Sequence, residues 1–292
     1  MKSILRGTGV ALVTPFKEDC SIDFDCLRAL VEYQIAGGVD YVVALGTTAE
    51  TPAISFSGRK QILQTVVETV NGRVPVVAGI GCNNPFEVME QFHLFDLRKV
   101  SAILSVAPYY NKPSQQGLLD HYRLIAKEAP LPLILYNVPG RTGVNIAAST
   151  VLTLAKENRN IVAVKEASGN LSQIMRIMAD KPEEFAVISG DDQLTLPLMA
   201  CGLDGVISVV ANAYPKEMSD MVRLALQGDF NAARALHYRL LPVMQTCFEE
   251  GSPSGVKTFL ELQRRSSSRV RLPLAPVSEE LRMRIQQIVN NF

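Results

Sequence analysis

The 292-residue sequence contains no tryptophan, only three histidines and only five cysteines. The cysteines are odd in number and form no CxxC pair, which disfavours a disulfide framework and a zinc ribbon. There is no HExxH motif, and we expect neither a metal ion nor an organic cofactor. No apolar run reaches the roughly 18 residues of a membrane span, and none near the start resembles a secretion signal. We therefore predict a reduced, cytoplasmic protein.

An excess of charge of one sign is also missing. Lys and Arg together number 29, and Asp and Glu together number 29. This balance argues against a broad cationic surface for nucleic acid or for an anionic membrane. Hydrophobic residues make up 47% of the sequence, which excludes an intrinsically disordered protein. A folded protein of this length accommodates two ordinary domains or one large barrel.

Eight short apolar runs alternate with longer amphipathic stretches. The runs are rich in Val, Ile, Leu and Ala, which is typical of strands buried on both faces. They cover 9–14, 41–45, 74–80, 102–107, 131–136, 161–165, 185–189 and 206–210. Apolar residues at helical spacing lie between them, for example in 24–36, 57–70, 115–129 and 170–179.

The number of strand–helix units favours a closed barrel. An open doubly wound sheet shows the same alternation, but a dinucleotide-binding sheet requires GxGxxG after its first strand. Gly7 and Gly9 precede the core of that strand instead, and no P-loop lysine follows a glycine loop. We predict an α/β protein with a (β/α)8 TIM barrel over residues 1–224 and a C-terminal helical region over residues 225–292.

The C-terminal region contains helical patterns at 216–227, 230–248, 256–264 and 279–289. The polar stretch 264–271 carries several arginines, and we expect it to be an exposed loop. We interpret the whole region as an extension of the barrel, because no strand pattern occurs in it.

Lys165 ends the apolar run 161–165, and active groups of parallel barrels gather where strands end. An ammonium group in a buried strand is unfavourable unless it is paired or deprotonated. One interpretation is a structural ion pair with Glu166 or Asp191, although strand alternation turns Glu166 to the opposite face. The other is a nucleophilic lysine that forms a Schiff base with a carbonyl.

Other polar residues also follow strands. Tyr136 would project at the same barrel end as that lysine, where it either packs or relays protons at a carbinolamine oxygen. Thr47 and Thr48 either cap a turn or bind a carboxylate. Arg141 is either a surface cation or a ligand for a substrate carboxylate, since its guanidinium binds carboxylates in a fork geometry.

Two further segments complete the pattern. Tyr109 and Tyr110 lie in a proline-bounded loop that suits an interface or a lid. In the stretch 189–192, either Asp191 or Asp192 is a helix cap, and glycine at position 190 allows a ligand to approach the backbone closely.

These segments together, in this order, resemble one family. The sequence is similar, essentially from end to end, to the pyruvate-dependent class I aldolases of the dihydrodipicolinate synthase and N-acetylneuraminate lyase superfamily. The matching stretches are 13–16, 46–50, 109–111, 136–143, 165–167, 189–192 and 205–208.

The resemblance implies a (β/α)8 barrel that condenses pyruvate with L-aspartate 4-semialdehyde in diaminopimelate and lysine biosynthesis. Lys165 matches the family's Schiff-base lysine, and Tyr136 matches the tyrosine that handles protons. Thr48 matches the threonine that links this tyrosine to Tyr110. Tyr110 looks like the residue that reaches into a neighbouring subunit, and the resemblance implies a homotetramer built from two tight dimers.

The same resemblance assigns the substrate contacts. Thr47 and Thr48 would bind the carboxylate of pyruvate, and Arg141 matches the arginine that binds the carboxylate of the semialdehyde. Gly190 and Ile207 match backbone positions near the lysine.

Two departures from the family pattern stand out. Ala49 replaces a glycine that is usual in its loop, and its methyl group could alter the turn. Phe56 and Arg59 stand where lysine-sensitive relatives often have histidines, so feedback inhibition by lysine is in doubt. The remaining residues of that allosteric site match the family at Asn83, Glu87 and Tyr109.

Two rival functions remain at this point. A sister lyase that cleaves sialic acid or a keto-deoxy sugar acid keeps the tyrosine and the lysine but usually lacks arginine at position 141. A non-catalytic barrel would have no need of both Lys165 and Tyr136. Arg141 and the stretch 189–192 favour the synthase.

Overall fold

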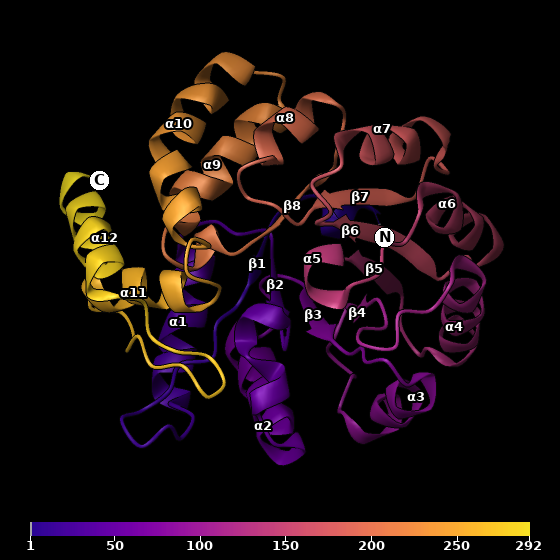
Figure 1. Ribbon diagram of the computed structural model, residues 1–292, viewed down its shortest axis with the longest axis horizontal. Coiled ribbons are helices and arrows are strands. Elements are labelled where there is room, and N and C mark those ends of the chain that lie inside the picture. Colours follow the sequence, from indigo (N-terminus) through magenta and orange to yellow (C-terminus); the bar gives the residue numbers. More distant parts are fainter. Residues whose placement is uncertain (1) are drawn as a thin grey trace.

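The computed structural model describes residues 2–292 and shows eight parallel strands that close into a barrel in sequence order (Figure 1). The strands are β1 (Gly7–Ala11), β2 (Tyr41–Ala44), β3 (Val76–Gly79), β4 (Ala102–Val106), β5 (Leu133–Asn137), β6 (Ile161–Glu166), β7 (Ala186–Ser189) and β8 (Gly205–Ser208). The predicted (β/α)8 barrel is confirmed. Its strands lie within the predicted runs or begin or end a few residues from them.

Helices surround the barrel on its outer side (Figure 1). They are α1 (Phe24–Ala36), α2 (Phe56–Val70), α3 (Pro85–Leu94), α4 (Gln115–Glu128), α6 (Ala148–Glu157), α7 (Leu171–Asp180), α8 (Thr195–Ala200) and α9 (Pro215–Leu226). Short helical turns occur in the connections: η1 (Lys2–Leu5), η2 (Thr47–Ala49), η3 (Thr51–Ala53), α5 (Pro139–Thr142) and η4 (Val210–Asn212). Within residues 2–292, no helix has both the length and the apolarity needed to cross a membrane.

Side-chain caps fix where several helices begin. Asp23 accepts a hydrogen bond from the backbone N–H of Cys26 at the start of α1, and Ser55 accepts one from Gly58 at the start of α2. Such caps satisfy N–H groups that have no partner inside the helix. Each cap therefore fixes the residue at which the helix begins after the loop.

The strands carry two hydrophobic layers. On β5, Ile134 and Tyr136 belong to the cluster that fills the barrel interior, whereas Leu133 and Leu135 belong to the larger cluster between strands and helices. The alternation follows from the strand repeat of two residues. Because both faces are buried, the strands read as continuous apolar runs rather than as alternating ones.

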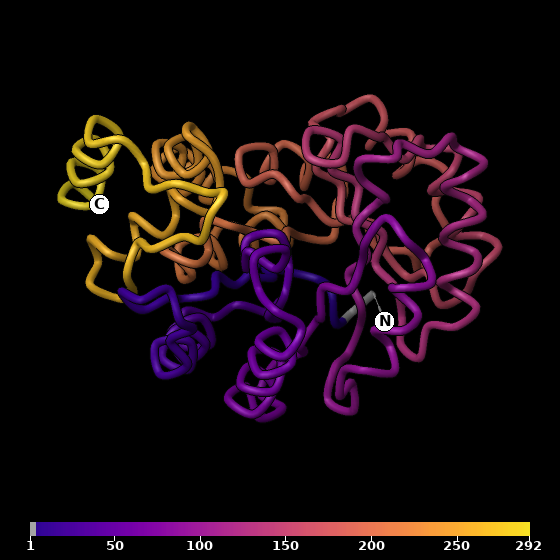
Figure 2. Tube along the Cα trace, turned by 60° about the horizontal axis from the view of Figure 1, so that its bottom comes forward, coloured from indigo at the N-terminus to yellow at the C-terminus, as the bar shows by residue number. Residues whose placement is uncertain are grey.

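Three further helices form the C-terminal region, at the left of Figure 1. They are α10 (Phe230–Thr246), α11 (Ser254–Leu262) and α12 (Glu279–Asn291). Asp229 caps α10 and Ser278 caps α12. Helix α10 packs against α9, and α12 packs against both α10 and α11. Seen from a second direction, α12 lies at the edge of the molecule, and the segment that follows α11 comes back toward the N-terminal segment (Figure 2).

The connection 264–271 is only partly exposed, so the expectation of an exposed loop was incomplete. Arg264 and Arg265 are exposed, but Val270 is buried and Arg271 is half-buried. Ser267 donates a 2.5 Å hydrogen bond to the carbonyl of Phe16. The loop therefore packs along the N-terminal segment of the barrel, which a local polar pattern does not reveal.

Candidate active site

Lys165 and Tyr136 meet at the C-terminal ends of β6 and β5. The two residues are paired in the strand register, and the Lys165 Nζ lies 4.4 Å from the centre of the Tyr136 ring. Lys165 is only 5% exposed. Among the residues that the structure describes, Lys165 forms no ion pair. Lys165 and Tyr136 thus lie side by side as predicted, and within the described residues Lys165 is not part of a structural ion pair.

Glu166, the neighbour of Lys165, is occupied on the other face of β6. Its carboxylate accepts hydrogen bonds from Asn137 Nδ2 at 2.5 Å, Gln173 Nε2 at 2.9 Å and Ser168 Oγ at 2.6 Å. A fully buried carboxylate requires such partners. The alternation that was expected to separate Glu166 from Lys165 is confirmed.

The stretch after β7 lies directly against Lys165. A Cβ atom at Gly190 would come within 2.9 Å of the Lys165 Cε and 2.7 Å of the Ala167 Cβ, so only glycine fits without a shift. The prediction that Asp191 or Asp192 caps the following helix was wrong, because Leu194 is the N-cap of α8 and no side chain caps it. Asp191 instead holds the turn before α8, where its Oδ1 accepts hydrogen bonds from the backbone N–H groups of Gln193 and Leu194. The second carboxylate of the stretch, that of Asp192, binds the loop after β8 instead.

Asp192 is that second carboxylate, and it holds the start of η4. Its Oδ2 accepts hydrogen bonds from the backbone N–H groups of Val209 at 3.0 Å and Val210 at 3.2 Å. Burial raises the pKa of Asp192 to about 6, against the lowering effect of these hydrogen bonds. Asp192 therefore fixes the loop after β8. Asp191, in contrast, lines the same cavity as Lys165.

Thr47 and Thr48 lie on η2, directly after β2. Thr47 is exposed and Thr48 is buried. Ala49 ends this turn in a right-handed conformation, and its carbonyl accepts a 2.8 Å hydrogen bond from Thr14 Oγ1. The left-handed residue is Glu50, with φ of 57°. The methyl group of Ala49 is thus accommodated, because its position does not require glycine.

One cavity of about 300 Å³ brings these residues together. The predicted residues that line it are Thr47, Thr48, Tyr136, Arg141, Lys165 and Gly190. Ile207 does not line it but belongs to the interior cluster beneath. Phe248 and Ser252 of the C-terminal region also line it, and the sequence interpretation missed both. Their only sequence signal is a Gly-Ser-Pro break between two helical patterns, which does not point to a site.

Arg141 stands at the mouth of this cavity. It lies on α5, the single helical turn that Pro139 begins after β5. Its guanidinium is exposed and approaches the carbonyl of Ser252 at 3.4 Å. The cavity therefore holds the amine of Lys165, the guanidinium of Arg141 and the side chain of Asp191 in its lining, and the guanidinium suits a substrate that carries a carboxylate.

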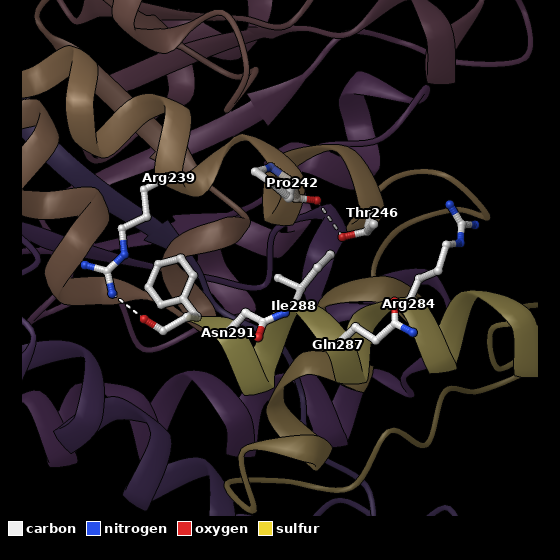
Figure 3. Close-up of a pocket in the computed structure, with 8 residues that line it drawn as sticks. Arg239, Pro242, Thr246, Arg284, Gln287, Ile288 and Asn291 are labelled. Carbon is white, nitrogen blue, oxygen red and sulfur yellow. Dashed lines mark hydrogen bonds between the residues drawn. The ribbon is translucent and has the colours of Figure 1, made fainter.

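A separate groove lies between α10 and α12 and contains none of the residues at the strand ends (Figure 3). It has a volume of about 430 Å³, and all the residues that line it belong to these two helices or to the end of the sequence, not to the strand ends. Its arginines already have partners, since Arg239 donates to the carbonyl of Phe292 and Arg284 pairs with Glu249. Across residues 2–292, no group of three or more His, Cys, Asp or Glu side chains is placed to hold a metal ion.

Comparison with known proteins shows the family to which this sequence belongs. The sequence model of the Dihydrodipicolinate synthetase family matches residues 4–292. The 4-hydroxy-tetrahydrodipicolinate synthase of Parabacteroides distasonis is 49% identical over 99% of this chain and 97% of its own. The synthase of Flavobacterium psychrophilum is 50% identical over 96% and 95%. The protein belongs to the dihydrodipicolinate synthetase family.

A solved structure with a bound small molecule agrees with this assignment. The dihydrodipicolinate synthase of Acinetobacter baumannii, complexed with pyruvate, has a TM-score of 0.94 and 38% identity, with 98% of each of the two proteins covered. The fold of that synthase and the barrel described above are therefore the same over essentially the whole length.

In this member of the family, Tyr110 lies outside its own cavity. It is 88% exposed and has a φ of 71°, which is uncommon for a bulky residue. Within residues 2–292, no hydrogen bond joins Thr48 to Tyr136 or to Tyr110. The relay that the family resemblance implies thus needs the Tyr110 of a neighbouring subunit, and it stays a prediction.

A second cavity, of about 510 Å³, adjoins the first and shares Thr47, Tyr136 and Arg141 with it. Two of the three residues that match the family's lysine site, Glu87 and Tyr109, line it, and Asn83 does not. Burial raises the pKa of the Cys82 thiol and of the Tyr109 phenol, and both groups line this cavity.

Arg59 also lines this second cavity. Its guanidinium lies 5.5 Å from the ring centre of Phe56, which itself packs on Phe95. A guanidinium here repels the ammonium groups of a lysine ligand. We expect millimolar L-lysine to inhibit turnover weakly or not at all in a steady-state assay. Half-maximal inhibition by submillimolar lysine would contradict this expectation.

Proposed function

We propose that the protein is a 4-hydroxy-tetrahydrodipicolinate synthase, a Schiff-base lyase that condenses pyruvate with L-aspartate 4-semialdehyde. The observation that carries the proposal is the buried Lys165, which has no ion-pair partner among the described residues and faces Tyr136 in a cavity with a guanidinium at its mouth. Relatives that are about half identical over nearly the whole length have this activity in their names.

The chemistry begins at Lys165. Its Nζ adds to the ketone carbon of pyruvate, and loss of water from the carbinolamine gives an iminium. The iminium withdraws electrons more strongly than a ketone, so the methyl group loses a proton and an enamine forms. The enamine carbon adds to the aldehyde carbon of the semialdehyde. Attack on the iminium by water or by the substrate's own amino group then returns Lys165 to the free amine.

Tyr136 is proposed to move the protons of these steps. Its hydroxyl is carried at the same strand level as Lys165, where it can protonate the carbinolamine oxygen and later receive a proton. Thr48 and a Tyr110 from a neighbouring subunit would connect this phenol to solvent. The exposure of Tyr110 supports such a contribution across an interface.

The substrate carboxylates are proposed to bind on two sides of the lysine. The hydroxyl and backbone N–H groups of Thr47 and Thr48 would bind pyruvate, in line with their place at the cavity wall. Arg141 would bind the carboxylate of the semialdehyde at the cavity mouth. Gly190 and Ile207 would bound the space beneath the bound pyruvate.

The assembly, the location and the internal division of the protein belong to the same proposal. We propose a homotetramer of two tight dimers in the cytoplasm, and all five cysteines are free, in line with a reducing compartment. We also propose that residues 1–224 form the catalytic barrel and that residues 225–292 form a distinct helical region.

Tyr110→Phe tests the role of the neighbouring subunit. We expect turnover to fall about tenfold or more, because the relay loses one hydroxyl, while gel filtration shows unchanged assembly. Tyr238→Phe is the matched control, since Tyr238 is also an exposed tyrosine and lies on α10. Wild-type turnover of Tyr110→Phe would remove this residue from the relay.

The choice of reaction is tested by substrate. Wild-type protein is incubated with pyruvate and L-aspartate 4-semialdehyde, and separately with N-acetylneuraminate, and product is followed in each case. We expect turnover with the semialdehyde and none of the sialic acid. The reverse pattern would assign the cavity to a sister lyase.

A further inference from the structure

The protein contains a second buried lysine, and its surroundings differ from those of Lys165. Lys257 lies on α11, and its Nζ is 2.5 Å from Glu50 Oε1 in an ion pair whose two side chains are fully buried. The same ammonium donates to the carbonyl of Arg269 at 2.7 Å and lies 4.2 Å from the ring centre of Phe16. Lys257 is therefore held by three contacts and is not a free nucleophile.

This ion pair connects the C-terminal region to the loop that carries the two threonines. Glu50 directly follows η2, which contains Thr47 and Thr48, and directly precedes η3. Its left-handed backbone is unfavourable for a residue other than glycine and persists only where neighbours hold it. A change in the backbone at position 50 would move Thr48, which is two residues away, relative to the cavity.

Both oxygens of the Glu50 carboxylate are fixed by the C-terminal region. Oε1 binds Lys257, and Oε2 accepts a 2.8 Å hydrogen bond from the backbone N–H of Arg271. The guanidinium of Arg271 donates to the carbonyl of Ala53 at 2.9 Å and to the carbonyl of Cys20 at 2.8 Å. The turns on both sides of Glu50 are thus anchored by side chains that lie more than two hundred residues later in the sequence.

A buried ion pair is a poor source of net stability, because desolvation offsets most of the attraction between the charges. What this arrangement supplies is a fixed position: its hydrogen bonds hold the Glu50 carboxylate, and with it the residue that directly follows η2. The site gains from this because carboxylate recognition by Thr47 and Thr48 depends on their placement relative to Lys165.

We propose that Glu50, Lys257 and Arg271 are positioning residues for pyruvate, which hold the Thr47–Thr48 turn in the geometry that binds the pyruvate carboxylate. The C-terminal region is then part of the binding machinery through this contact and not only a wall of the cavity. The inference rests on the proposed Schiff-base function and assigns an origin to the site's affinity for its first substrate.

In the experiment, the protein is reduced with borohydride at increasing pyruvate concentrations. Intact mass then gives the fraction of the protein that carries the adduct. Glu50→Gln, Lys257→Met and the double variant are compared with wild type after circular dichroism has shown that they fold. We expect the pyruvate concentration for half-maximal trapping to rise about tenfold or more in each variant, as for loss of a charged hydrogen bond. Full trapping at saturating pyruvate and an unchanged KM for the semialdehyde are expected alongside.

The double variant separates positioning from stability. It leaves no buried charge unpaired, so it should recover thermal stability relative to the single variants while keeping the raised pyruvate requirement. If Lys257→Met does not fold, Arg271→Met carries the test, because Arg271 is only half-buried. Thr258→Val is the matched control: this buried neighbour on α11 bonds only within its own helix, at the carbonyl of Ser254.

The outcomes distinguish this inference from the proposed function. No adduct in wild type at any pyruvate concentration would overturn the Schiff-base function and this inference together. Wild-type half-saturation in the folded variants would overturn the positioning role alone. An equal shift in Thr258→Val would do the same, because it would show that any destabilisation of α11 has this effect.

Discussion

Replacing Lys165 by alanine is expected to reduce kcat by about 10⁴-fold or more, since the covalent route through the iminium is lost. Lys165→Arg should be equally inactive, because a guanidinium keeps a charge at the site but is not a nucleophile at neutral pH. The measurement is steady-state turnover with both substrates at saturation, together with circular dichroism to show that the barrel is intact.

Lys156→Ala is the matched control for this experiment. Lys156 is an exposed lysine on α6, away from the strand ends, and its removal should leave kcat unchanged. Retention of turnover within about tenfold of wild type in Lys165→Ala would place the reacting amine elsewhere. The other buried lysine, Lys257, would be an unsuitable replacement, because it is paired with Glu50.

Tyr136→Phe is expected to lower kcat by about 10²-fold to 10³-fold, as is usual when a positioned acid–base group is removed. The ring should keep its place, since it packs in the interior cluster and against the Lys165 ammonium. We therefore expect the Schiff base to form still, but slowly. Rapid-quench trapping with pyruvate gives the rate of adduct formation, and steady-state assays give kcat.

A second buried tyrosine provides the control for that variant. Tyr41 also points into the barrel interior, and its hydroxyl is 3.4 Å from the carbonyl of Val206. Tyr41→Phe removes one hydroxyl from the interior without touching the cavity, so kcat should stay close to wild type. Equal losses in the two variants would mean that packing, and not proton transfer, explains the effect at Tyr136.

Much of the fold follows from local pattern. Strands buried on both faces, such as β6, must be apolar throughout, and this makes them visible in the sequence. Lys165 stands out because it ends such a run, and its partner Tyr136 follows from sequence order, since consecutive strands of a barrel are neighbours. The alternation that separates Glu166 from Lys165 follows from strand geometry alone.

The contacts of the C-terminal region could not be predicted in this way. Glu50 and Lys257 lie 207 positions apart, and no local pattern encodes which helix packs over which loop. A weak signal exists at Lys257, because it lies between Val256 and Phe259 in a helix whose first turns are entirely buried. Such a lysine must be paired, but only the structure identifies the partner.

The cavity wall shows the same limit. Phe248 and Ser252 reach the site from the connection between α10 and α11, and their neighbours in sequence give no sign of it. Position 49 illustrates a different limit, since a turn that usually contains glycine tolerates Ala49 because the left-handed residue is Glu50. Backbone angles of this kind depend on the packed loop and not on residue type alone.

The measurement that tests the central claim most directly is borohydride reduction of the wild-type protein in the presence of pyruvate, followed by intact mass and peptide mapping. We expect one reduced pyruvate per subunit, attached at Lys165, and none in Lys165→Ala. An unmodified wild-type protein in a folded sample, or an adduct at any other lysine, would contradict the Schiff-base mechanism at this site.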